Sequence, residues 1–201
     1  MLDGAAKIES LASEVARLGD GAIAMTDHGN VFGAFDFYKT MKAAGVKPII
    51  GIEAYIAPES RFEKRRVKWA DGGEDDVSAG GAYTHMTILA QDNSGLANLY
   101  RLSSLAYLEG FYYKPRMDRE ILAQHSTGLI ATTGCAGGEI QTRLRMGAYG
   151  EARAAAAIYR DIFGADNYFV EVMEHGIEIE KRVKDDLLRS EEHTSELQSR
   201  F

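Results

Sequence analysis

Two hydrophobic periodicities alternate along the chain. The first is the three- and four-residue spacing of an amphipathic helix, which begins with Ile8, Leu11, Val15 and Leu18. Gly19 follows these positions and is a natural helix stop. The second is a short apolar run, residues 22–25, which predicts a strand. Helical spacing then resumes over residues 31–44, and Gly45 closes that segment.

The same alternation continues to residue 172. Further apolar runs predict strands at residues 48–52, 86–90, 129–131 and 168–172. Helical spacing predicts helices at residues 95–108, 139–146 and 151–163. Strands that alternate with helices favour parallel βα units, so we expect an α/β fold, either a doubly wound sheet or a barrel.

One segment, residues 59–82, interrupts this alternation. It is charged and then glycine-rich, without sustained periodicity, and we interpret it as an exposed insertion loop. Its basic half has residues that could contact a nucleic-acid backbone with aromatic help: Arg61, Lys64, Arg65, Arg66 and Lys68, beside Phe62 and Trp69. A solvated loop balanced by Glu74, Asp75 and Asp76 is the simpler alternative, and short charge runs favour it.

Composition narrows the class of protein. The 201 residues, 45% of them hydrophobic, suffice for one domain with a core. No apolar run approaches the roughly 20 residues of a membrane span, and the N-terminus lacks signal-peptide features, so we expect a cytoplasmic protein without membrane contact. Cys135 is the single cysteine, which excludes an internal disulfide. The net charge of -7 opposes nucleic-acid binding without a local basic patch or bound cations.

Five residues with metal-binding side chains recur at about the length of one βα unit: Asp3, His28, Glu53, His85 and Cys135. His28, Glu53 and Cys135 follow predicted strands, where a barrel gathers its functional groups, whereas His85 precedes its strand and fits less well. Imidazole, carboxylate and thiolate ligands suit zinc or another transition metal. Two or three cations held there would hydrolyse a phosphoester by activating water.

Each candidate also has a simpler interpretation. Asp3 could cap the first helix, and Cys135 could be a small buried apolar group. A single histidine or glutamate after a strand is more often a hydrogen-bonded core residue than a ligand. His125 lies at a helix end and fits the surface, and His175 follows a strand as a weaker ligand candidate.

Five blocks of sequence, in order, resemble the PHP domain at the start of bacterial DNA polymerase III alpha subunits: LDGAAKI, TDHGNVFGAFDFYK, KPIIGIEAYIAP, LSSLAYLEGFYYKPRMD and GLIATTGCAGGEIQTRL. The resemblance covers residues 2–188 and implies a partial, distorted (β/α)7 barrel similar to a TIM barrel, with a metal cluster at its mouth. It assigns the family's ligands to Asp3, His28, Glu53, His85 and Cys135, and implies divalent ions such as zinc, manganese or magnesium.

The sequence departs from this family at both ends. The family has a His-x-His pair shortly before the LDG block and an Asp-x-His motif on a later strand, and neither occurs here. We therefore expect residues 1–188 to be an incomplete PHP domain. Residues 189–201 resemble a translated sequencing adapter and are interpreted as a non-native tail, so His193 is not counted as a ligand.

The resemblance implies a fragment of a DNA-directed DNA polymerase, a nucleotidyltransferase of DNA replication. In the intact parent the PHP domain would have metal-dependent 3′–5′ exonuclease capacity, with DNA, other replicase subunits and the rest of the polymerase chain as partners. The fragment alone is expected to be inactive. Two alternatives stay open: a structural PHP module without catalysis, and a stand-alone PHP phosphoesterase. The segments FYYKPRMD and GCAGGEIQTRL resemble the polymerase branch.

Overall fold

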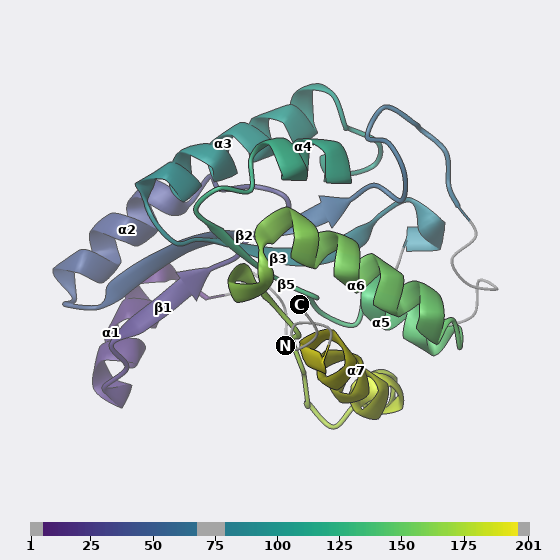
Figure 1. Cartoon of the computed structure of the whole chain (residues 1–201). Helices are drawn as coiled ribbons and strands as arrows, with labels where there is room; N and C mark the ends of the chain where they lie inside the picture. The colour runs from purple at the N-terminus through teal and green to yellow at the C-terminus, as the bar shows by residue number, and fades with distance from the viewer. Residues whose placement is uncertain (1–5, 68–78, 197–201) are drawn as a thin grey trace.

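Helices surround a central twisted sheet (Figure 1). The computed structural model describes residues 6–67 and 79–196, the last seven of these as backbone only. The helices are α1 Ile8–Leu18, α2 Ala34–Ala43, α3 Asn93–Leu108, α4 Arg119–Gln124, α5 Glu139–Arg145, α6 Tyr149–Phe163 and α7 Glu178–Glu196. The strands are β1 Ala22–Met25, β2 Lys47–Ile56, β3 Thr84–Ala90, β4 Arg116–Met117, β5 Leu129–Thr132 and β6 Tyr168–Phe169. The expected α/β class is confirmed.

The sheet is mixed, and this corrects the expectation of parallel βα units. Its strand order is β1-β2-β3-β5-β6, with β4 paired to β2. Strand β1 runs parallel to β2, and β5 runs parallel to β6. Strand β3 is antiparallel to both of its neighbours, β2 and β5.

The connection between β2 and β3 explains the reversal. A parallel return needs a crossover, usually a helix, that carries the chain back to the other end of the sheet. In the described parts of residues 57–83 the helical structure is limited to the three-residue turn Ala79–Gly81. The chain therefore re-enters the sheet where β2 ends, and Tyr55 pairs with His85. His85 lies at the same edge as the ends of β1 and β2 because β3 runs in the opposite direction.

Local patterns predicted the first elements well. Helix α1 and strand β1 have the expected positions, and Gly19 ends α1 with a φ of 80° that glycine tolerates. Helix α2 begins later than expected because the side chain of Asn30 accepts a hydrogen bond from the Phe32 amide and holds a turn there. Strand β4 and helix α7 were not predicted, whereas α4 ends next to His125, which the sequence analysis placed at a helix end. Strand β6 ends at Phe169 rather than at residue 172.

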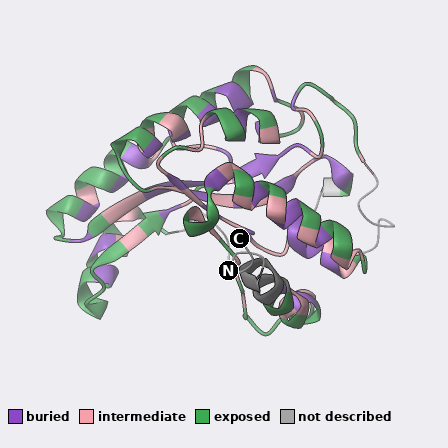
Figure 2. Ribbon diagram, in the orientation of Figure 1, coloured by how far each residue is buried: buried purple, intermediate pink, exposed green. Residues whose placement is uncertain are grey.

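The hydrophobic core joins the sheet to helices α1, α2, α3, α4 and α6 (Figure 2). The isoleucine and leucine side chains of this core that are no more than 1% exposed are Ile52, Ile56, Ile88, Leu99, Leu102, Ile121, Leu122 and Leu129. Burying each such side chain stabilises the fold by about 1.5–3 kcal/mol. A second apolar cluster joins α5, α6 and α7, where Val183 and Leu187 of α7 are 3% exposed. Helix α7 therefore packs on the domain as far as Leu187.

A buried arginine on β4 connects the segment after β2 to the sheet through hydrogen bonds. Arg116 on β4 is fully buried, and its guanidinium donates to four backbone carbonyls. The acceptors are Gly110 at 3.1 Å, Ala82 at 3.1 Å, Arg61 at 3.1 Å and Glu63 at 2.9 Å. Burial lowers the pKa of Arg116, although the charge of Asp118 opposes this effect. The two described ends of the 59–82 segment are thus tied to one guanidinium.

Three carboxylates surround the neighbouring Arg61. Its guanidinium lies 2.7 Å from Glu109, 3.0 Å from Asp118 and 2.8 Å from Glu120. Asp118 also accepts from the Ile121 amide and so caps α4. Burial alone would lower the pKa of Arg61, but the hydrogen bonds from Glu109 and Glu120 and the charge of Asp118 raise it. Arg61 is therefore a structural cation that joins the segment after β2 to α3 and α4.

Candidate metal centre

His28 and Glu53 are brought together by backbone pairing at the ends of β1 and β2. A parallel bridge joins the two residues beyond the end of β1. The Gly29 amide donates to the Glu53 carbonyl at 2.9 Å, and the Glu53 amide donates to the Asp27 carbonyl at 3.1 Å. Gly29 has a φ of 69°, and a Cβ there would lie 2.7 Å from the Tyr55 ring. Glycine at this position lets the His28 loop lie flat against β2.

His85 and Cys135 reach the same edge from β3 and from the loop after β5. His85 faces Tyr55 across the strand pair, and its amide donates to the Gly137 carbonyl at 3.0 Å. Gly134 has a φ of 79°, and a Cβ there would lie 3.0 Å from the His85 carbonyl oxygen. The Cys135 loop therefore needs glycine to pack against β3.

The donor atoms of His28, Glu53 and His85 all lie within 4.8 Å of one another. Glu53 stands between the imidazoles: Oε1 lies 2.6 Å from His85 Nδ1, and Oε2 lies 3.2 Å from His28 Nε2. The Cys135 sulfur lies 3.4 Å from Glu53 Oε1 and 3.6 Å from His85 Nδ1. Donors bound tetrahedrally to one zinc at ~2.0–2.3 Å would lie about 3.3–3.8 Å apart. The two distances from the Cys135 sulfur lie within that range, and the Glu53–His28 distance is close to it. The 2.6 Å contact between Glu53 and His85 is a hydrogen bond and would have to lengthen around an ion. The donor set is compatible with a metal ion.

The electrostatics of the cluster favour a charged carboxylate beside a protonated thiol. Burial raises the pKa of Glu53, but the hydrogen bond from His85 and the charges of His85 and His28 lower it overall. Burial raises the pKa of Cys135 to about 12, and the charge of Glu53 adds to that rise. Glu53 is therefore ready to bind a cation, whereas Cys135 must lose a proton before it can do so.

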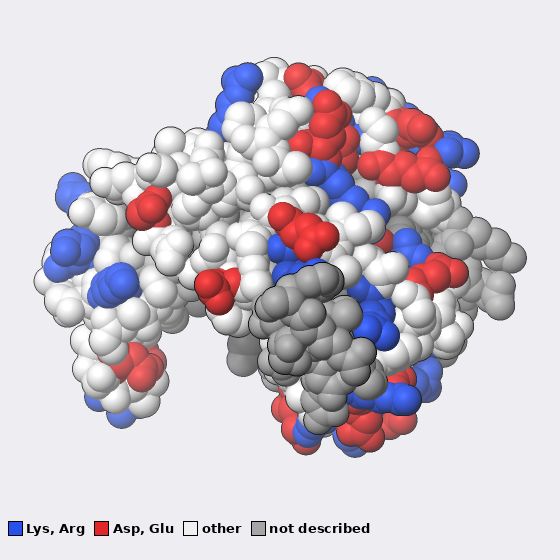
Figure 3. All heavy atoms as spheres, in the orientation of Figure 1, with Lys and Arg blue, Asp and Glu red and all other residues white. Residues whose placement is uncertain are grey.

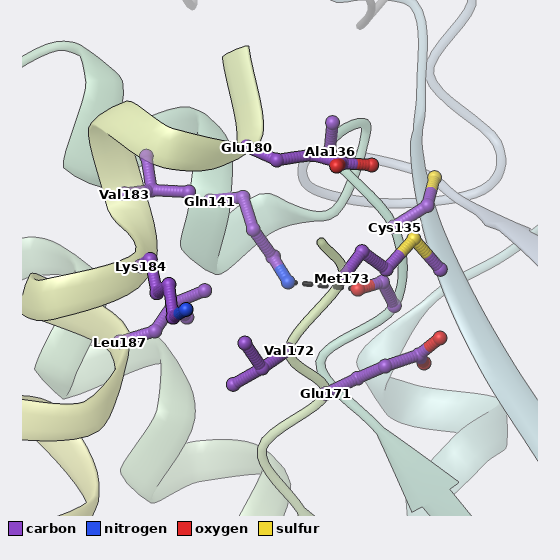
Figure 4. Close-up of a pocket in the computed structure, with 11 residues that line it drawn as sticks. Cys135, Ala136, Gln141, Glu171, Val172, Met173, Glu180, Val183, Lys184 and Leu187 are labelled. Carbon is purple, nitrogen blue, oxygen red and sulfur yellow. Dashed lines mark hydrogen bonds between the residues drawn. The ribbon is translucent and has the colours of Figure 1, made fainter. Parts of the chain in front are cut away.

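Two polar residues that the sequence analysis missed support this site. Gln141 on α5 is 2% exposed, and its amide nitrogen donates to the Gly134 carbonyl at 2.8 Å (Figure 4). The same nitrogen donates to Thr133 Oγ1 at 3.1 Å. It therefore holds the loop that carries Cys135. Glu171 accepts from Thr132, and Figure 4 shows Glu171 and Cys135 extending away from α7. Glu171 comes shortly after β6, just as Glu53 comes after the strand predicted at residues 48–52. The expectation that functional residues follow strands could therefore have identified Glu171 as a candidate.

The structure brings together four of the five predicted ligands: His28, Glu53, His85 and Cys135. Asp3 lies outside the described residues. His175 is not a member of this donor group, and its Nδ1 contacts Glu180 at 2.9 Å. His125 is half-buried at the end of α4, not fully on the surface.

The prediction that Arg61 contacts nucleic acid is wrong. Its side chain is 8% exposed and lies among three carboxylates. A charged residue in a sequence run gives no sign of partners that lie far along the chain, and Asp118 is 57 positions away. Lys68, another predicted contact, lies outside the described residues.

The other basic residues of this segment differ in their surroundings. Arg65 is exposed and pairs at 2.5 Å with both Glu59 and Glu63. Arg66 is exposed, and its guanidinium lies 5.2 Å from the centre of the Tyr113 ring. On the face drawn in Figure 3, acidic and basic side chains are interspersed without one continuous basic stripe. Within the described residues, none of the helices combines the length and apolar character that crossing a bilayer requires.

The sequence of this chain matches a known protein family. The family model described as PHP domain matches residues 1–175. The chain is 55% identical over 198 residues to the DNA polymerase III subunit alpha of Saccharopolyspora erythraea, covering 94% of this chain and 17% of the relative. The corresponding Mycobacterium tuberculosis protein is 57% identical over 191 residues, covering 94% and 16%. The Thermus aquaticus protein is 50% identical over 185 residues, covering 91% and 14%.

The chain thus spans about a sixth of the length of these relatives. The family match extends from the His28 loop through Glu53, His85 and Cys135, and so includes the whole described donor cluster. The mixed α/β sheet with donors gathered at one edge agrees with that match. This chain belongs to the PHP domain family.

Proposed function

We propose that this chain is part of the N-terminal PHP domain of a bacterial DNA polymerase III alpha subunit. In the complete polymerase, its metal centre would take part in hydrolysing the terminal phosphodiester at the 3′ end of DNA. The observation that carries the proposal is the convergence of His28, Glu53 and His85 at one sheet edge, with Cys135 beside them. The names of relatives at 50–57% identity supply the polymerase context.

The parent protein would then be a DNA-directed DNA polymerase of replication, a nucleotidyltransferase that acts in the cytoplasm. Its partners would be DNA, the other replicase subunits and the remainder of the polymerase chain. Residues 1–188 would form an incomplete PHP domain, with 59–82 as an insertion loop. In the described part of that loop, residues 62–66 are exposed, whereas Arg61 and Ala82 anchor it.

His28, Glu53, His85 and Cys135 would hold the ion, and Asp3 would be a fifth ligand. Imidazole and thiolate donors favour zinc, whereas the carboxylates also suit manganese or magnesium. A bound divalent ion lowers the pKa of bound water and neutralises charge on phosphoryl oxygens. Gln141 fixes the loop of Cys135 through its hydrogen bonds to the Gly134 carbonyl and Thr133. Such supporting hydrogen bonds typically change metal affinity by 10- to 100-fold.

Two alternative functions within the same family are a structural module without catalysis and a stand-alone phosphoesterase. A structural module would not need four donor side chains directed at one another, so their retention favours a functional site. A stand-alone phosphoesterase would act on a small phosphorylated molecule. The relatives named DNA polymerase III subunit alpha argue against that alternative.

A cobalt titration of the 201-residue chain tests the metal centre. Cobalt reports tetrahedral binding by its visible d–d bands and thiolate binding by a near-ultraviolet charge-transfer band. We expect weak but measurable binding, loss of the charge-transfer band in Cys135→Ser, and weaker binding in His28→Ala. His125→Ala is the matched control and should behave as the unmodified chain does. A spectrum that is the same in His28→Ala and in the unmodified chain would contradict the proposed ligand set.

The chain alone is expected to show negligible nuclease activity, because the family's His-x-His and Asp-x-His motifs do not occur in it. Vigorous 3′–5′ degradation of single-stranded DNA that is abolished by His28→Ala would overturn this expectation. That outcome would also show that the donors present here suffice for catalysis.

A further inference from the structure

An exposed tyrosine with an unusual backbone lies in the segment between α3 and β4. Tyr113 has a φ of 60°, whereas every other described residue with positive φ is a glycine. The Tyr112 amide donates to the Lys114 carbonyl at 3.0 Å, which closes a tight turn around Tyr113. The turn leaves the Tyr113 ring 60% exposed. A bulky residue with positive φ is strained, and such strain is concentrated at functional sites.

Two cations flank this turn. The Arg66 guanidinium lies 5.2 Å from the centre of the Tyr113 ring, within the range of a cation–π contact. The Lys114 ammonium lies 5.7 Å from the centre of the Tyr55 ring. Both cationic residues are exposed. An exposed aromatic ring with positive groups nearby is a combination that binds single-stranded nucleic acid, because bases stack on the ring and phosphates pair with the cations.

The turn is connected to the metal centre through Tyr55. The Tyr55 ring centre lies 6.2 Å from that of His28 and 5.2 Å from that of His85. Lys114 contacts the same ring, so a single aromatic side chain separates this ammonium from two ligand candidates. A strand with one phosphate at the metal centre could therefore place a neighbouring phosphate near Lys114.

We propose that Tyr113, Lys114 and Arg66 form a shelf that binds single-stranded DNA beside the metal centre. A base stacks on Tyr113, Lys114 contacts a phosphate next to the one that is hydrolysed, and Arg66 contacts the backbone on the far side of the ring. The choice of DNA as occupant rests on the proposed function. The shelf itself rests on the ring contacts, the exposure and the two cations. It would give a chain of net charge -7 the local basic patch that nucleic-acid binding requires.

The test is equilibrium binding of a fluorescent oligothymidylate to the 201-residue chain, measured by anisotropy at low salt with a chelator present. The chelator removes any contribution from metal ions. Tyr113→Ala should bind about 5- to 100-fold more weakly, as expected for loss of one stacked base. Tyr113→Phe should bind like the unmodified chain because it keeps the ring. Lys114→Gln should reduce the slope of log affinity against log salt by about 0.7, the effect of one phosphate contact with a single strand.

Matched controls come from helix α2, where Tyr38 and Lys42 are also exposed. In Figure 1, α2 lies on the left, whereas the segment between α3 and β4 lies on the right. Tyr38→Ala and Lys42→Gln should leave both the affinity and the salt slope unchanged. A second variant, Tyr113→Gly, separates binding from folding. Glycine accepts a φ of 60° without strain, so Tyr113→Gly should keep or raise the urea midpoint while still losing affinity.

Three results would overturn the shelf. The first is that the unmodified chain fails to bind the oligothymidylate. The second is that Tyr113→Ala and Lys114→Gln bind it as tightly as the α2 control variants do. The third is that duplex DNA binds as tightly as single strands and depends equally on Tyr113. Failure of the proposed function is distinguishable from each of these. A failed cobalt titration together with Tyr113-dependent DNA binding would leave the shelf standing as a DNA site. A normal cobalt titration with Tyr113-independent binding would remove the shelf alone.

Discussion

The Arg116 cluster and the metal centre are two groups of polar residues beside β2, and they differ in burial and in the kind of group at their centre. Around Arg116, a fully buried guanidinium donates to four backbone carbonyls. At the metal centre, the side chains of His28, Glu53 and His85 are 35%, 18% and 16% exposed. The two Glu53 oxygens lie 2.6 Å from His85 Nδ1 and 3.2 Å from His28 Nε2.

This difference separates a structural cluster from a functional one. The Arg116 cluster already contains its cation, and each nitrogen of the guanidinium has an acceptor. At the metal centre, the lowered pKa of Glu53 keeps this group a carboxylate beside two imidazoles and a thiol, all of which are side chains that bind metal ions. Buried polar groups need partners, so a group of ligands directed at one another is suited to an ion.

The largest expected effect is on the Arg116 cluster. Arg116→Met should lower the free energy of unfolding by about 3–5 kcal/mol, because it leaves four carbonyls, three of them buried, without their donor. Urea unfolding followed by circular dichroism measures the change. The matched control is Arg101→Met on the exposed face of α3, which should stay within about 0.5 kcal/mol. Equal losses of unfolding free energy in the two variants would show that the hydrogen bonds of Arg116 do not stabilise the fold.

The second prediction concerns the reactivity of Cys135. Its pKa, raised to about 12, leaves far less thiolate at pH 8 than a free cysteine with a pKa of about 8.5 would have. Alkylation by iodoacetamide should therefore be slower than in the urea-unfolded chain, on the order of a hundredfold or more. The rate should still rise with pH above 9, where a free thiol has levelled off. The chain has a single cysteine, so the rate reports this thiol alone.

Glu53→Gln separates the two causes of that slow alkylation. The charge of Glu53 contributes to the raised pKa of Cys135, so its removal should speed alkylation, whereas burial should keep the rate below that of the unfolded chain. A native rate equal to the unfolded rate would mean that the Cys135 thiol is neither buried nor influenced by Glu53. The metal centre would then be more open than its geometry indicates.

The sequence predicted much of this site because ligand residues next to strands recur with the fold. His28 follows β1, and Glu53, which follows the strand predicted at residues 48–52, lies inside the longer β2 of the structure. The two strands are parallel neighbours, so the convergence of these residues could be expected from topology. The role of His85 could not, because residues 57–83 have no periodicity that reveals whether the next strand returns parallel or antiparallel. The reversed direction of β3 is what brings His85 to the site.

Partners that are distant in sequence account for the errors elsewhere. Arg61 stood in a basic run and was taken for a nucleic-acid contact, but its carboxylate partners lie 48 to 59 positions away. Gln141 carries no motif, and only its contact with the Cys135 loop shows what it does. Local periodicity predicts elements such as α1 and β1 because their residues are neighbours along the chain. It does not predict which charged groups will meet.

The smallest expected effect concerns the C-terminal tail, for which residues 189–201 are predicted to be non-native. Helix α7 extends through that boundary to Glu196, and its last side chains buried in the second apolar cluster are Val183 and Leu187. Leu188 is 43% exposed, and the Arg189 guanidinium lies 5.4 Å from the Tyr149 ring centre. Packing therefore supports the helix up to Arg189.

Removal of residues 190–201 should lower the free energy of unfolding by less than about 0.5 kcal/mol, the range of surface changes. The segment has Leu197 and Phe201 as its apolar side chains, too few to offset an ordering cost of roughly 1–2 kcal/mol per residue. Helix beyond Arg189 would then reflect the local propensity of its glutamates and neighbouring residues.

The comparison is a urea titration of the shortened and full chains, with Leu187→Ala as the positive control. That substitution removes a buried side chain and should cost about 2–5 kcal/mol. A loss above about 1 kcal/mol on truncation would show that the tail is part of the fold.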